Sequence, residues 1–248
     1  MKRQNLFIKI IKYLLIISSL LIVVYIGLNL FVKSKEIKVD KNKLMNDTDI
    51  SLSDEQIKIA CLVLYEHMNP EFHNYHFLIN DAFSTRNNIA LSTANIYIGK
   101  YCDIRNLGDT SMEYQIIDLA TKRYVMKNID YKLCYNYVFS NAYFGKSTYL
   151  AASNEVCCSQ KVSQSVFIPL ISPQGARYEN FRTNQLYGLK NASEFYFSKN
   201  YKDLTSKEFI SLCLLINNPH IYDFLEEENK KRFEEKVNEI YMKLSNDN

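Results

Sequence analysis

The sequence predicts a mainly α-helical domain behind an N-terminal transmembrane helix, and three observations carry this prediction. The chain has 248 residues, of which 47% are hydrophobic, so it is long enough for one domain with its own core and an anchor. It contains only 6 Gly and 4 Pro, and its longer apolar segments show helical spacing. A net charge of +3 does not indicate nucleic-acid binding, and no P-loop, Rossmann glycine pattern or paired CxxC motif is present.

The N-terminal segment predicts an uncleaved membrane anchor. Residues 13–32 form an uncharged run of 20 residues, about the length that a helix needs to cross a bilayer. The preceding tail, residues 1–12, is basic and favours a cytoplasmic N-terminus. No small-residue cleavage site follows the run, as a signal peptide would require. Residues 33–52 are lysine-rich and are expected to form a polar stalk that could rest on anionic headgroups, and residues 53–248 form the domain.

The first helix of the domain ends in a candidate catalytic residue. Ser53 to Gln56 open this helix, apolar residues follow, and the helix runs into Glu66. A carboxylate at the end of an apolar helix would be partly desolvated and could take a proton from an attacking hydroxyl. The alternative is a solvated glutamate at a helix end. The histidines that follow have no HExxH spacing and are interpreted as loop residues: His67, His73 and His76.

The next candidate site follows a helix predicted over residues 87–98. A glycine and small hydroxyls can bring donors close to a phosphate or a sugar. The residues concerned are Gly108, Thr110, Ser111 and Gln115. The carboxylates of Asp109 and Glu113 would repel an anionic donor unless a metal ion bridges them to it. A Ser/Thr helix cap is an equally good interpretation. Lys132 could hold a pyrophosphate as a point charge.

The C-terminal third predicts a buried helical hairpin. Apolar residues at helical spacing end near Phe197, and Thr205 with Glu208 forms the capping box of a second helix. Pro219 ends that helix, and residues 226–244 predict an amphipathic helix. The six cysteines fit no zinc motif and are interpreted as structural or free thiols, although the adjacent pair at 157–158 leaves a redox or metal role open.

The hairpin resembles the end of the family 51 glycosyltransferase domain, which polymerises lipid-linked peptidoglycan precursors. The residues that carry this resemblance are Tyr187, Gly188, Ala192, Tyr196, Phe197, Lys199, Leu204, Thr205, Glu208, Pro219 and Tyr222. By the same resemblance, Glu66 stands where the family has its catalytic glutamate. The donor-side groove would be lined by Gly108, Thr110, Ser111 and Gln115, with Lys132 on the pyrophosphate. Tyr131 and Tyr135 replace the arginine and the second glutamate of the family motif, and residues 155–185 have no counterpart.

The resemblance therefore implies a lysozyme-like, mainly α fold and two alternative functions. In the first, the protein is a divergent peptidoglycan glycosyltransferase with Glu66 as base and a divalent cation, Mg or Mn, helping the leaving group. In the second, it is a non-catalytic relative that binds the precursor or scaffolds cell-wall synthesis proteins. Both place the protein at the cell membrane, with a cytoplasmic N-terminus, the domain on the exterior face, and no nucleic-acid partner.

Overall fold

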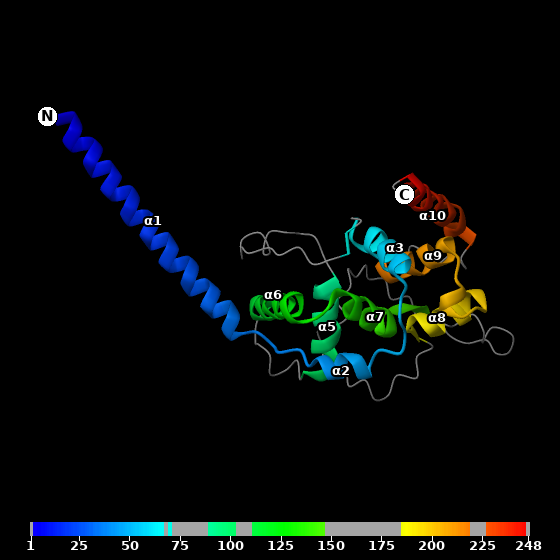
Figure 1. Ribbon diagram of the computed structural model, residues 1–248. Helices are drawn as coiled ribbons and strands as arrows, with labels where there is room; N and C mark the ends of the chain where they lie inside the picture. Colours follow the sequence, from blue (N-terminus) through cyan, green and yellow to red (C-terminus); the bar gives the residue numbers. More distant parts are fainter. Residues whose placement is uncertain are drawn as a thin grey trace.

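The computed structural model is a helical body from which one long helix projects (Figure 1). It describes residues 2–66, 69–70, 89–102, 111–146, 185–218 and 227–246. The predicted mainly α fold is confirmed, because most of the described residues are helical. The elements are α1 Lys2–Ser34, α2 Lys41–Asn46, α3 Asp54–Tyr65, α5 Ile89–Tyr101, α6 Ser111–Asn128, α7 Tyr131–Asn141, β1 Tyr143–Lys146, β2 Gln185–Tyr187, α8 Leu189–Phe197, the 3₁₀ turn η3 Tyr201–Asp203, α9 Ser206–Asn217 and α10 Glu227–Asn246.

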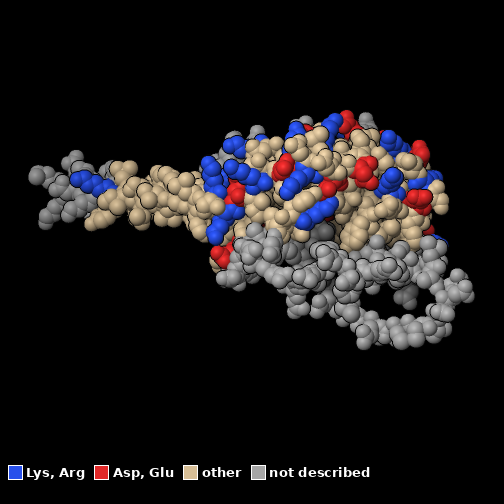
Figure 2. All heavy atoms as spheres, turned by 90° about the horizontal axis from the view of Figure 1, so that it is seen from below, with Lys and Arg blue, Asp and Glu red and all other residues tan. Residues whose placement is uncertain are grey.

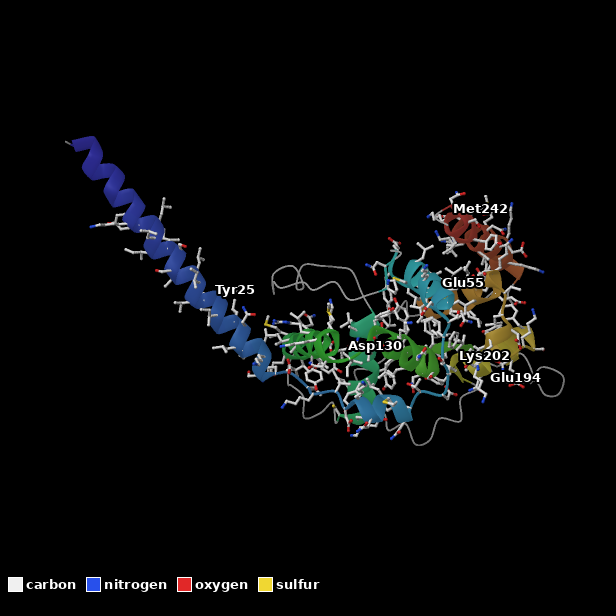
Figure 3. All side chains as sticks on the ribbon, in the orientation of Figure 1. Tyr25, Glu55, Asp130, Glu194, Lys202 and Met242 are labelled. Atoms are coloured by element: carbon white, nitrogen blue, oxygen red, sulfur yellow. The ribbon has the colours of Figure 1, made fainter. Side chains whose placement is uncertain are left out.

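Helix α1 is long and apolar enough to cross a membrane. Its segment Lys12–Ser34 spans 23 residues with a mean hydropathy of 2.5, and most of its apolar side chains are exposed. Among the described residues, it is the last turns of α1 that meet the body. There Val32 is buried against Ala120 of α6, and Tyr25, labelled in Figure 3, packs beside them.

The segment expected to be a stalk, residues 33–52, differs from that expectation because it packs against the body along most of its length. Val39 and Leu44 are 3% and 0% exposed and belong to the main core. The backbone N–H of Asp40 donates to the Tyr97 hydroxyl at 3.2 Å, and that of Leu52 donates to the Asn136 amide oxygen at 2.9 Å. Ile50 and Leu52 are buried in the same core, so apolar residues at four positions hold this polar segment against the body.

The core lies where α3, α7 and α9 meet. Helix α3 packs on α9, and α5 packs on both α6 and α7. Phe139 of α7 stacks on Phe209 of α9 with ring centroids 5.6 Å apart. Both rings are almost fully buried, and each such side chain contributes on the order of 2 kcal/mol to stability by leaving water.

Two capping boxes are present, and the sequence predicted the one at Thr205 and a helix start at the other. Ser53 and Gln56 cap each other at the start of α3, and Thr205 and Glu208 do so at the start of α9. Lys199 reinforces the second box by donating to Glu208 Oε1 at 2.7 Å. Each box satisfies backbone N–H groups that the first turn of a helix leaves without a partner.

A short antiparallel pair of strands, which helical periodicity did not predict, lies between α7 and α8 in the chain. Strand β1 pairs with β2 through an irregular register. The chain then turns at Gly188, whose φ of 83° is open to glycine and costly for other residues. Across this turn the Tyr196 hydroxyl of α8 donates to the Phe144 carbonyl at 3.0 Å. Gly188 and Tyr196, two of the family-like residues of the hairpin, thus have structural roles here.

Candidate functional site

Glu66 ends helix α3 in a left-handed conformation. Its φ and ψ are 58° and 26°, and its backbone N–H donates to the Leu62 carbonyl as the helix C-cap. The side chain is exposed, so the desolvation expected for it is wrong. The physical reason is local: an αL residue turns the chain away from the helix axis and leaves its side chain on the outside of the turn.

A cation from α10 lies in the electrostatic surroundings of Glu66. Lys243 donates to Glu239 Oε1 at 2.7 Å, and Lys236 donates to the other carboxylate oxygen at 2.9 Å. The pKa of Lys243 is raised, mainly by its hydrogen bond and attraction to Glu239 and in smaller part by the charge of Glu66. The same two lysines lower the pKa of Glu239 to about 2. Lys243 on this charged face of α10 is therefore close enough to Glu66 to respond to its charge, and the sequence prediction of the site did not include it.

The donor-side residues fall at and before the start of α6. Gly108 and Thr110 lie outside the described residues. Ser111 is the first residue of α6, and only its backbone is described. Gln115 lies one turn into α6 and is exposed. Glu113 forms an ion pair with Lys35 at 3.4 Å, so its negative charge is partly balanced by a lysine of the protein itself.

Two buried polar groups on α6 were missed by the sequence prediction. Tyr114 and Asp118 are four residues apart on one face of the helix. The Tyr114 hydroxyl and Asp118 Oδ1 have no hydrogen-bond partner in the part of the chain that the structure describes. Burial raises the pKa of Asp118 to about 6. The available signal was an aspartate between isoleucines and leucine, where a helix normally presents an apolar residue to its neighbours.

Lys132 lies far from Glu66. Its Nζ is 2.6 Å from Oδ1 of Asp54, the first residue of α3, whereas Glu66 follows the last residue of that helix. A helix of 12 residues is about 18 Å long. The structure therefore places Lys132 and Glu66 at opposite ends of α3 and does not bring them together.

Tyr135, at the position of the family's second glutamate, is part of the core. It is 1% exposed and hydrogen-bonds to Cys61 of α3. Burial raises its pKa far above the usual tyrosine range. No carboxylate or donor at this position would reach a solvent-filled cleft without opening the packing of α7 on α3.

Helix α5 lies between the end of α3, where Glu66 follows, and α6, which carries the donor-side residues Ser111 and Gln115. The Tyr65 hydroxyl, next to Glu66 in the chain, lies 3.2 Å from Ser92 Oγ on α5, and α5 packs against α6. Within the described residues, no group of three or more His, Cys, Asp or Glu side chains could hold a metal ion. Asp109 and the three histidines, His67, His73 and His76, lie outside the described residues. The divalent cation that the resemblance implies therefore stays a prediction, and no step below uses one.

Comparison with protein-family models gives one match, to the family described as transglycosylase, over residues 178–245. The described part of this region contains β2, α8, η3, α9 and most of α10, including Lys243. Comparison with curated proteins gives no match.

Proposed function

We propose, from the match of residues 178–245 to the transglycosylase family, that this chain is a peptidoglycan glycosyltransferase-like protein that works at a membrane surface. Helix α1 supports membrane anchoring by its length and composition. The substrate is a lipid-linked disaccharide precursor, whose apolar tail lies in the bilayer that α1 enters. The N-terminus is cytoplasmic and the body lies on the exterior face, where this precursor is polymerised.

The backbone conformation of Glu66 is the observation that carries the catalytic proposal. Helices that stop with an αL residue normally use glycine or asparagine there. A longer side chain in this conformation costs roughly 1–2 kcal/mol. Glutamate at 66 therefore makes a weaker helix stop than glycine would, and a functional carboxylate accounts for this loss of stability.

The chemistry assigned to Glu66 is general-base catalysis. Glu66 accepts the proton of the acceptor sugar hydroxyl while that oxygen forms a bond to the anomeric carbon of the donor. The bond from the anomeric carbon to the pyrophosphate oxygen breaks, and the lipid pyrophosphate leaves with the electron pair. Gly108, Thr110, Ser111 and Gln115 are proposed for the donor side. Lys132 is left out of this site because Asp54 holds it at the other end of α3.

A second function, precursor binding without catalysis, is favoured by the buried Tyr135. The second carboxylate implied by the family resemblance is absent there, and the position is closed to substrate. Loss of one charge-stabilising group typically slows an enzyme by about 100- to 1000-fold. A protein that keeps the fold and the membrane anchor but lacks this group would hold the precursor for partner proteins of cell-wall synthesis.

A polymerisation assay separates the two functions. The full chain is reconstituted in vesicles with a labelled lipid-linked disaccharide, and glycan product and bound precursor are both measured. For the enzyme, Glu66→Gln should lower the rate by roughly 100- to 10,000-fold, the usual contribution of a general base. If the unmodified chain binds the precursor but forms no product, the second function is supported. If it shows no binding and forms no product, both functions are contradicted.

A matched pair of glycine variants tests whether Glu66 is kept for function. Ser198 also ends a helix in the αL conformation, with φ of 52°, and is exposed. Glu66→Gly and Ser198→Gly should therefore both raise the stability of the body by roughly 1 kcal/mol. Only Glu66→Gly should abolish product formation. Full activity in Glu66→Gly would remove Glu66 from the mechanism.

A further inference from the structure

A cluster of lysines surrounds the point where α1 joins the body, and we name Lys33, Lys35, Lys38, Lys41 and Lys43 the basic collar. Figure 2 shows basic side chains gathered on the body beside the base of the projecting helix. Within residues 33–43 only Glu36 and Asp40 oppose these five lysines. This short segment carries an excess of positive charge equal to that of the whole chain, +3.

The basic collar is held in place by the body. Val39, between Lys38 and Lys41, is buried at 3% exposure, and Leu44 at the end of the segment is fully buried. The Ile37 backbone N–H also donates to Thr121 Oγ1 of α6 at 3.4 Å. The lysines therefore keep a fixed place next to the end of the apolar helix, which is the level of the headgroups once α1 spans a bilayer.

Three acidic groups near the basic collar have partners within the protein, and for one of them the partner is a lysine of the collar itself. Glu113 is engaged by Lys35, and Asp47 is engaged by Lys100 at 2.7 Å. The Asp40 carboxylate caps α2 by accepting from the Asn42 N–H. Among the described residues, four exposed lysines of the collar have no ion-pair partner: Lys33, Lys38, Lys41 and Lys43. Lys43 lies over the Tyr101 ring, 4.7 Å from its centroid, which leaves the other three for binding.

We propose that the basic collar is a binding surface for the headgroups of anionic lipids in the leaflet on the side of the body. The proposal rests on the membrane anchoring given under Proposed function, and it adds a lipid preference that anchoring alone does not require. A basic residue near an anionic membrane surface gains about 1 kcal/mol, which is roughly a fivefold change in association for each lysine. The collar thus sets the lipid composition immediately around the precursor.

Lipid selectivity measured on the full chain tests the proposal. The protein is reconstituted in phosphatidylcholine vesicles, and the immobilised fractions of spin-labelled phosphatidylglycerol and spin-labelled phosphatidylcholine are compared. We expect the anionic lipid to associate several-fold more strongly at low salt. In 1 M NaCl, where the Debye length falls to about 3 Å, this preference should largely disappear.

Two triple variants with the same charge change complete the test. Lys33→Gln, Lys38→Gln and Lys41→Gln together should remove the preference. The matched control replaces three exposed lysines on α3, α8 and α10, namely Lys58, Lys190 and Lys231, by glutamine and should keep it. Equal association of the two lipids with the unmodified chain, or an equal loss in both variants, overturns the proposal.

Flotation of the vesicles separates this proposal from the anchoring on which it rests. If the full chain fails to float with vesicles of any composition, the anchoring is wrong and the collar has no membrane to bind. If the chain floats and shows no anionic preference, only the collar proposal fails. Circular dichroism of both triple variants should match that of the unmodified chain, because the three collar lysines lie on the surface.

Discussion

Replacing Gly188 by alanine should strongly destabilise the body, because this glycine is required on two counts. Its φ and ψ of 83° and 138° lie in a region that side-chain-bearing residues rarely adopt, at a cost of about 1–3 kcal/mol. A Cβ at this position would also lie 2.9 Å from the Ser140 carbonyl oxygen, and this contact is with backbone. Relief of such overpacking typically costs another 1–3 kcal/mol or so.

The expected total for Gly188→Ala is on the order of 4 kcal/mol. For a body of this size it should lower the thermal midpoint by roughly 8–16 °C. The measurement is thermal unfolding of the full chain in detergent, followed by far-ultraviolet circular dichroism. Gly27→Ala is the matched control, since a Cβ there would meet nothing within 4 Å and should leave the midpoint unchanged. A drop of less than 2 °C or so for Gly188→Ala would show that the turn adapts and that the reasoning is wrong.

Three further predictions concern the body. Thr205→Ala removes the N-cap of α9 and should cost about 1 kcal/mol in chemical unfolding; no loss would mean that Glu208 alone holds the first turn. The folded state keeps the Asp118 proton up to a pKa of about 6, against 3.8 when unfolded, so stability should fall as pH rises between these values. After allowance for partial exposure, the free energy of unfolding should fall by about 2 kcal/mol over this range. Urea titrations at pH 4.5 and 7.5 measure this fall, and Asp118→Asn should abolish it. If the variant keeps the same pH dependence, other groups cause the fall. Tyr135→Glu places a carboxylate in the core and should cost roughly 3–5 kcal/mol, seen as lost near-ultraviolet dichroism, instead of restoring turnover; a stable variant with raised activity would return position 135 to the site.

Local chemistry made much of the helical framework predictable. The capping boxes at Ser53 and Thr205 lie within four consecutive residues each, and the end of α9 at Asn217 follows from the proline two positions later. The uncharged run in α1 is equally local, since only length and composition matter. The C-terminal helix, α10, begins and ends within two residues of its predicted bounds.

What depends on distant contacts could not be read from the sequence. Lys132 is held by Asp54, far away along the chain, and no local pattern marks that pair. Val39 and Leu44 look like isolated apolar residues in a polar segment, although the core buries both. The burial of Tyr135 depends on the packing of α7 against α3, whereas a motif comparison places it at a site.

The packing of residues 33–52 onto the body has a geometric consequence for the protein's range of action. Fully extended, these 20 residues would reach roughly 65–70 Å and would let the body drift away from the bilayer. Folded back through Val39 and Leu44, they leave almost no slack between α1 and the rest of the chain. With α1 across a bilayer, the body is therefore held close to the lipid surface, within reach of molecules presented there.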